Sequence, residues 1–105
     1  MTTETLLPVF AALADETRWS ILTALGEGDA SASALAGRLP VSRQAIAKHL
    51  AVLQEVGLVE PVRAGREERF RVVAAELSAT AAKLDMIGHE WDRRLAAIKE
   101  IAEGL

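Results

Sequence analysis

The sequence predicts a mainly α-helical fold with one small β-hairpin. Half of its 105 residues are hydrophobic while two Trp and two Phe are the only aromatic residues, which favours closely packed helices over a β-sandwich. Apolar residues recur at helical spacing in several segments. Arginines alternate with apolar residues around position 70, close to a glycine, as in a short hairpin. At this length we expect a single domain, residues 1–105.

Two helices are expected in the first quarter of the chain. The first should run from about Glu4 to Ala14 and, because Pro8 is awkward inside a helix, its regular part should begin near that proline. Asp15 is a suitable N-cap for the second, Glu16 to Leu25. Its expected inner face is Ile21, Leu22 and Leu25, and the glycines expected to end it are Gly26 and Gly28.

A short helix, a tight turn and a second helix are expected next. Ser31 can cap a helix from about Ala32 to Leu39, which Pro40 should stop. Ser42 can then cap a fourth helix that runs to about Glu55, before Gly57 turns the chain. This arrangement predicts a helix-turn-helix.

Two strands are expected after the fourth helix, Leu58 to Ala64 and Glu68 to Val73, with a turn at Ala64-Gly65-Arg66. In the second strand Phe70 and Val72 should share one face, and the arginines on either side of Phe70 should share the other. A basic hairpin beside a groove-reading helix is the working part of a winged helix-turn-helix.

The last segment, about Ala75 to Glu103, predicts a long helix with a heptad seam. Apolar or small residues alternate at spacings of four and three, namely Leu77, Ala81, Leu84, Gly88, Trp91, Leu95, Ile98 and Ala102. Such a helix spans roughly 40 Å, more than a small domain covers. The seam therefore predicts a homodimer, with Leu84, Gly88, Trp91, Leu95 and Ile98 at the interface.

Helical geometry identifies the residues expected to contact DNA. On the fourth helix Gln44 and Lys48 lie opposite the apolar face, with Ser42 and Arg43 at the tip. Gln suits adenine, and Lys suits guanine acceptors or phosphate. His49 lies some 60° from the centre of the apolar face, so a structural or phosphate-contacting role is favoured over base reading. The complete predicted DNA-binding set is Ser42, Arg43, Gln44, Lys48, His49, Arg63, Arg66 and Arg69.

Charge and composition narrow the function further. The net charge is −3, but residues 38–71 carry seven basic and four acidic residues, so this segment is +3 and the rest is −6. The absence of cysteine excludes disulfides and thiolate metal sites. No apolar run is long enough to cross a bilayer and the start lacks a secretory signal, so we expect a cytoplasmic protein without a membrane partner.

The chain resembles the ArsR-type winged helix-turn-helix repressors over nearly its whole length. The resemblance rests on LADETRWSIL (13–22), SRQAIAKHLAVLQEVGLVE (42–60), RAGREERFRV (63–72) and HEWDRRLAAIKE (89–100). It implies a homodimeric repressor that binds an inverted-repeat operator in double-stranded DNA. It also implies pairing through the first and last helices, which adds Leu6 and Phe10 to the expected interface.

The sequence departs from the metal-sensing members of that family. Ser31-Ala32-Ser33-Ala34 stands where a thiolate motif is expected, and cannot bind soft metals. Asp85, His89 and Asp92 could form a hard or zinc-like site in a dimer, although a solvated helix face is the favoured interpretation. We therefore expect no metal and no cofactor.

Other function classes remain as alternatives. A winged helix could serve as a protein-interaction or RNA-binding module without an operator. An enzyme is disfavoured, because His49 and His89 lie in expected helices without a nucleophile motif or phosphate loop. Trp19 and Trp91 are expected to pack in the core rather than line a ligand pocket, and the sequence identifies no small-molecule effector.

Overall fold

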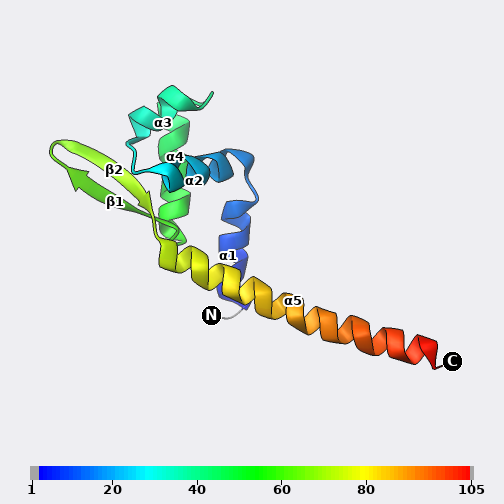
Figure 1. Cartoon of the computed structure of the whole chain (residues 1–105). Coiled ribbons are helices and arrows are strands. Elements are labelled where there is room, and N and C mark those ends of the chain that lie inside the picture. Colours follow the sequence, from blue (N-terminus) through cyan, green and yellow to red (C-terminus); the bar gives the residue numbers. More distant parts are fainter. Residues whose placement is uncertain (1–2, 105) are drawn as a thin grey trace. The chain divides into compact units, whose positions relative to one another are not determined.

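The computed structural model describes the backbone of residues 3–104 and the side chains of residues 6–104, as five helices and one hairpin (Figure 1). The elements are α1 (Thr3–Leu13), α2 (Glu16–Glu27), α3 (Ala32–Arg38), α4 (Arg43–Glu55), β1 (Val59–Ala64), β2 (Glu67–Val72) and α5 (Ala74–Glu103). The chain divides into two compact units, Met1–Ala74 and Ala75–Leu105, and each is described by itself.

Side-chain caps start the three helices after α1 at the residues that the sequence indicates. Asp15 accepts a hydrogen bond from the backbone N–H of Arg18 at 3.0 Å. Ser31 accepts one from Ala34 at 3.1 Å, and Ser42 accepts one from Ala45 at 3.2 Å. Each cap satisfies a backbone donor that the first helical turn leaves free, so the predicted starts of α2, α3 and α4 are confirmed.

One apolar core holds α2, α3, α4 and the base of the hairpin together. Its largest side chains are at most 2 % exposed and come from all of these elements: Ile21, Leu35, Ile46, Leu50, Leu53, Leu58 and Val59. Burying each side chain of this size contributes about 1.5–3 kcal/mol. The apolar face predicted for α4 is thus its buried face, and the opposite face is left to solvent.

The hairpin is an antiparallel pair in which Pro61 faces Phe70. Gly65 has a φ of +65°, which a residue with a side chain rarely adopts, and it forms the predicted turn. An isolated bridge joins β2 to the loop before α3: Phe70 N–H donates to the Ala30 carbonyl at 2.8 Å, and Ala30 N–H donates to the Phe70 carbonyl at 3.2 Å. The bridge fixes the hairpin, here called the wing, to the helix-turn-helix.

Several expectations about single residues are wrong. Helix α1 begins at Thr3, five residues before Pro8, so the proline lies inside the helix and removes one backbone donor there. Gly26 lies inside α2, which ends at Glu27 with Gly28 as its C-cap. Trp19 is 59 % exposed, since Ile21 and its neighbours occupy the inner face of α2 and turn the indole outward.

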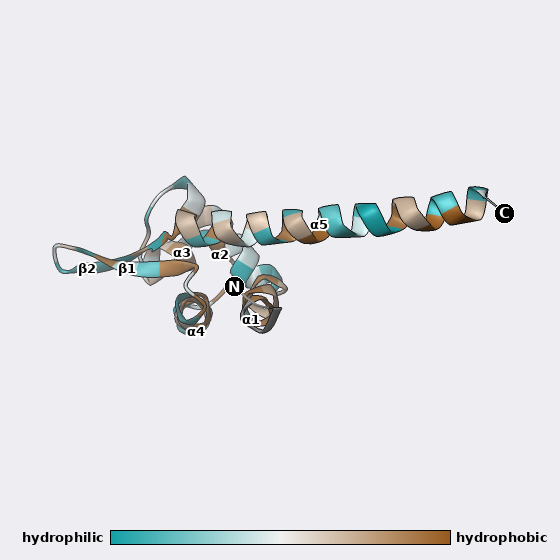
Figure 2. Ribbon diagram, turned by 90° about the horizontal axis from the view of Figure 1, so that it is seen from below, coloured by the Kyte–Doolittle hydropathy of each residue, from teal (hydrophilic) through white to brown (hydrophobic). Residues whose placement is uncertain are grey.

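Helix α5 has 30 residues and a long uncovered apolar face. Apolar segments recur along it in Figure 2, and Trp91 is 54 % exposed rather than packed in a core. A lone amphipathic helix has nothing of its own to bury such a stripe against. Among the described residues, no helix combines the length and the hydrophobicity needed to cross a membrane.

Candidate nucleic-acid interface

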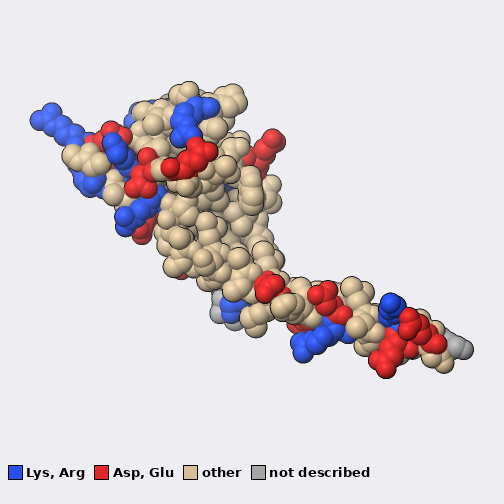
Figure 3. All heavy atoms as spheres, viewed as in Figure 1, with Lys and Arg blue, Asp and Glu red and all other residues tan. Residues whose placement is uncertain are grey.

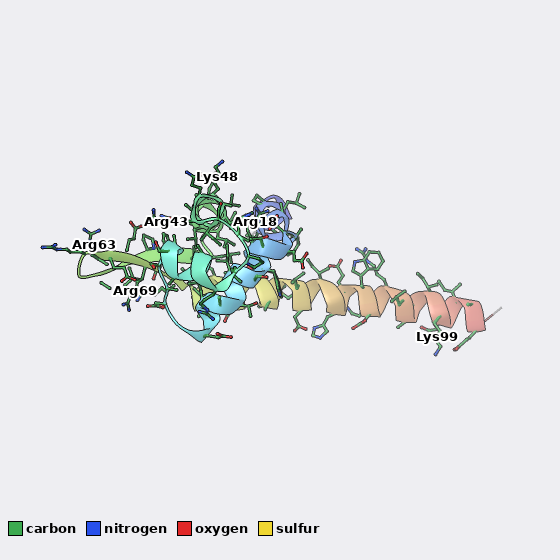
Figure 4. The ribbon with its side chains drawn as sticks, turned by 90° about the horizontal axis from the view of Figure 1, so that it is seen from above. Arg18, Arg43, Lys48, Arg63, Arg69 and Lys99 are labelled. Carbon is green, nitrogen blue, oxygen red and sulfur yellow. The ribbon has the colours of Figure 1, made fainter. Side chains whose placement is uncertain are left out.

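The solvent face of α4 presents the polar residues that the helical geometry selects. Ser42, Arg43, Gln44 and Lys48 are all exposed, and so is Ala47 among them. Because Ile46, Leu50 and Leu53 anchor the opposite side, this face is held outward by the core. Exposed donors and acceptors among small alanine methyls suit the edges of bases in a major groove. Figure 4 shows Arg43 and Lys48 projecting from α4.

An open groove of about 810 Å³ lies between the start of α3, the start of α4 and the wing. Three arginines line it, Arg43 from α4 and Arg63 and Arg66 from the wing. Glu67 and Glu68 line it as well, so the groove is basic by a margin of one charge. The Ala30–Phe70 bridge places the wing beside α3, and the groove is a consequence of that attachment.

The two faces of the wing differ in how their charges are used. Arg71 pairs with Glu60 at 2.6 Å across the strands, and Arg69 pairs with Glu67 at 3.3 Å along β2. Within residues 6–104, no carboxylate lies within ion-pair distance of Arg43, Lys48, Arg63 or Arg66. Mixed acidic and basic atoms cover the wing in Figure 3. Phosphate contacts are thus favoured at Arg63 and Arg66 over Arg69.

His49 is turned away from the exposed face of α4. Its side chain is 23 % exposed, with Nδ1 at 3.3 Å from Nη1 of Arg18 and 4.0 Å from the Asp15 carboxylate. An arginine can only donate, so this contact is a hydrogen bond in the tautomer whose Nδ1 accepts. The geometry supports the structural role for His49, while its place in the predicted DNA-binding set remains a prediction.

The exposed apolar face of α5 includes the predicted seam. Leu84, Trp91, Leu95 and Ile98 are 49–61 % exposed, and nothing lies within 4 Å of a Cβ built on Gly88. On α1, Leu6 is buried at 4 % within the chain's own core and Phe10 is half-buried, so Leu6 offers no free surface to a partner. Leu7, at 59 %, is the exposed large hydrophobic residue among the described side chains of α1.

His89 of α5 contacts one carboxylate of the same helix, that of Asp85. Asp85 and His89 are one turn apart, with 3.9 Å between Oδ1 and Nε2, and both side chains are more than 70 % exposed. In the described part of the chain, no three His, Asp or Glu side chains gather closely enough to hold a metal ion. Asp85 and His89 are thus solvent-exposed in the single chain, and the absence of a metal stays a prediction.

Sequence reasoning missed Arg18, Leu7, Ile87 and Ile101. The last two are exposed at 40 % and 67 % and widen the apolar face of α5 beyond a strict heptad seam, to an arc of about 140° at 100° per residue. A helical projection of the whole segment, rather than of the heptad positions, would have found them. Arg18 has no such signal, because its partner His49 is 31 residues away.

The chain is similar to known regulators over most of its length. A family model described as a helix-turn-helix domain matches residues 13–62. An HTH-type transcriptional regulator of Mycobacterium tuberculosis is 35 % identical over 88 % of this chain and 83 % of its own. The arsenical resistance operon repressor of Escherichia coli is 34 % identical over 95 % of this chain and 86 % of its own.

Solved structures extend the similarity to the fold. An ArsR-like transcriptional regulator from Rhodococcus sp. RHA1 is 68 % identical, with a TM-score of 0.87 over 94 % of this chain and 93 % of that one. A homodimeric winged helix-turn-helix DNA-binding domain from Mycobacterium bovis is 25 % identical, with a TM-score of 0.68 over 83 % of this chain and 81 % of that one.

Proposed function

Since this chain belongs to the ArsR-type winged helix-turn-helix family and is a DNA-binding transcriptional regulator, we propose that it acts as a homodimeric repressor at an inverted-repeat operator. The exposed face of α4 enters the major groove, and the wing lies against the adjacent backbone or minor groove. Binding at a promoter then excludes the transcription machinery. The relative named as an operon repressor supports the direction of this regulation.

The observation that carries the proposal is the set of free cations around one exposed helix. Arg43 and Lys48 on α4 and Arg63 and Arg66 on the wing have no carboxylate within ion-pair distance among the described residues. They flank Gln44, which can form a bidentate contact to adenine. Operator recognition needs two kinds of contact: cations that bind phosphates and position the protein, and side chains such as an amide that contact bases and give sequence specificity.

The uncovered face of α5 supports the dimer. Its apolar arc is wider than a two-stranded seam needs, and a second copy of the same helix is the simplest cover because a two-fold interface is self-complementary. The solved relative described as homodimeric has the same fold. Two copies then place two α4 helices about 34 Å apart, one turn of the duplex.

Selection of bound duplexes from a random DNA pool tests the proposal. We expect enrichment of a pseudo-palindrome whose half-sites are about one helical turn apart. A pool that yields a single half-site bound by one monomer removes the dimer. A pool without any enriched sequence, together with binding to structured RNA or to a protein, favours the alternative winged-helix module.

The remaining expectations follow from the same proposal. A transcriptional regulator that acts like its bacterial relatives works in the cytoplasm, where its operator is. We assign the chain no catalytic step, no metal and no cofactor, and phosphate contacts account for the free cations of α4 and the wing. No effector is assigned either, so binding is set by the protein's own concentration in this proposal.

A further inference from the structure

Arg18 joins three helices through one side chain. Its Nε donates to the Ala12 carbonyl at 2.7 Å and its Nη2 donates to the Ala11 carbonyl at 3.3 Å. Its Nη1 donates to Nδ1 of His49 on α4 at 3.3 Å, while its own backbone N–H binds the Asp15 cap of α2. The side chain is 18 % exposed, and its contacts with Ala12 and His49 are part-buried, whereas the contact with Ala11 is exposed.

The carbonyls that Arg18 binds need a partner. The last four carbonyls of a helix have no donor within that helix, and Ala11 and Ala12 lie in the last turn of α1. A cation is also stabilised at that end by the helix dipole. The guanidinium therefore has a fixed orientation, set by α1, before it meets His49. A lysine could not replace it, because three separate donors in one plane are required.

His49 provides α4 with a directional contact to the rest of the fold. The core contacts of Ile46, Leu50 and Leu53 set which side of α4 is buried. A hydrogen bond adds a directional constraint, which hydrophobic contact lacks. In residues 6–104, the Arg18–His49 contact is the one side-chain hydrogen bond between α4 and another helix. His49 follows Lys48 in the sequence, so this contact lies on the flank of the exposed face of α4.

We propose that Arg18 and His49 are positioning residues for DNA recognition, through which the end of α1 sets the rotation of α4 in the groove. The inference rests on the proposed function and adds a structural link between a terminal helix and the reading helix. His49 then acts without touching DNA. A change at the end of α1 alters specific binding, while non-specific phosphate contacts are left as they were.

The test measures specific and non-specific affinity side by side, on the selected operator and on a scrambled duplex of equal length. The ratio of the two is independent of the folded fraction, so a variant that merely unfolds leaves it unchanged. His49→Leu removes the acceptor, and His49→Gln keeps one. We expect His49→Leu to lower the ratio about tenfold, the loss of one charge-assisted hydrogen bond, and His49→Gln to restore it.

Arg18→Lys tests the other half of the contact. It should lower the ratio to a similar extent, and the double variant with His49→Leu should lose no more than either single variant, because both break one contact. Arg38→Gln is the matched control. Arg38 also joins two helices, through Glu27 at 2.9 Å, but its ion pair is exposed and does not reach α4. Its ratio should equal that of the wild type.

Three results overturn the inference. One is a fall in the salt dependence of binding for His49→Leu that His49→Gln does not reverse, because this identifies a direct phosphate contact. Another is additive loss in the double variant. The third is an unchanged ratio in all variants while the wild type binds its operator. A wild type that selects no duplex at all instead refutes the proposed function.

Discussion

Asp15 connects the stability of the helical unit to pH. The Arg18 backbone N–H that it accepts, and then the Arg18 charge, hold the pKa of this carboxyl below its ordinary value of 3.8. A depressed pKa stabilises the fold above the unfolded value, and the contribution is lost as pH falls through the folded pKa. The carboxylate that caps α2 therefore also sets part of the acid limit of the protein.

Asp15→Asn isolates that contribution. Asparagine is an equally good N-cap without a charge, so the variant should be less stable than the wild type at pH 7 and approach it below pH 3.8. Urea unfolding at several pH values measures the difference. Ser31→Ala is the control, because it removes an uncharged cap and should cost about 1 kcal/mol at every pH. A pH-independent difference for Asp15→Asn contradicts the assignment.

Gln44 and Lys48 lie one turn apart on the exposed face of α4, and replacing each of them should change DNA binding in a different way. Gln44→Ala should relax the preference at one base pair by about 1–3 kcal/mol and leave the salt dependence unchanged. Lys48→Ala should weaken all duplexes and reduce the slope of log affinity against log salt by about 0.9. Binding curves on operator variants at several salt concentrations separate the two. Unaltered operator binding in both variants means that this face does not read DNA.

At the scale of elements, two of the four arginines of the wing are neutralised by ion pairs. Arg69 and Arg71 are paired with Glu67 and Glu60, and the two acidic residues keep that face from adding to the positive field. An exposed pair of this kind contributes little to stability, so its effect is on where charge is presented. The cations left for phosphate lie at the turn and on the groove side.

Arg66→Ala should therefore reduce the salt slope by about 0.9, since one phosphate contact is lost. The matched control removes both members of a pair, Arg69→Ala with Glu67→Ala, and leaves the net charge as it is. Its slope should equal the wild-type slope. Equal losses in the two proteins contradict the division of the wing into a free and a neutralised part.

The elements and their starts could be predicted from the sequence because their causes are local. Asp15, Ser31 and Ser42 each accept a hydrogen bond from a backbone N–H only three residues downstream. The faces of α4 follow from the spacing of its apolar residues alone. The Ala30–Phe70 bridge could not be predicted, since a backbone contact between residues 40 apart leaves no pattern in either segment. The same holds for Arg18 and His49, whose meeting depends on how three helices pack.

The interface prediction shows where periodicity is ambiguous. Leu6 and Leu7 are adjacent leucines on α1, and only the packed helix decides that the first is buried and the second exposed. On α5, Leu84, Trp91, Leu95 and Ile98 of the heptad seam are exposed, and Ile87 and Ile101 make the exposed arc broader. A search for a heptad repeat selects the apolar residues at heptad positions and overlooks apolar residues beside them on the same helix face.

At the scale of the whole molecule, two terminal helices and the reading helix have to act together. An operator with two half-sites is bound tightly only when two α4 helices are held at a fixed separation. A monomer could still contact one half-site, but it would lack the contacts that a second α4 makes with the other half-site. The exposed apolar arc of α5 is thus as important to specific affinity as any residue that touches a base.

Leu95→Glu, alone or with Ile98→Glu, tests this directly. A charge in the centre of a two-fold apolar interface is buried twice, and we expect monomers in sedimentation at concentrations where the wild type is dimeric. Affinity for the full operator should fall by at least tenfold, while affinity for a single half-site stays the same. Met86→Glu is the matched control: Met86 is 65 % exposed but lies about 150° around α5 from the seam, so its variant should remain a dimer. If Met86→Glu dissociates the protein and Leu95→Glu does not, the chains pair through the other face of the helix.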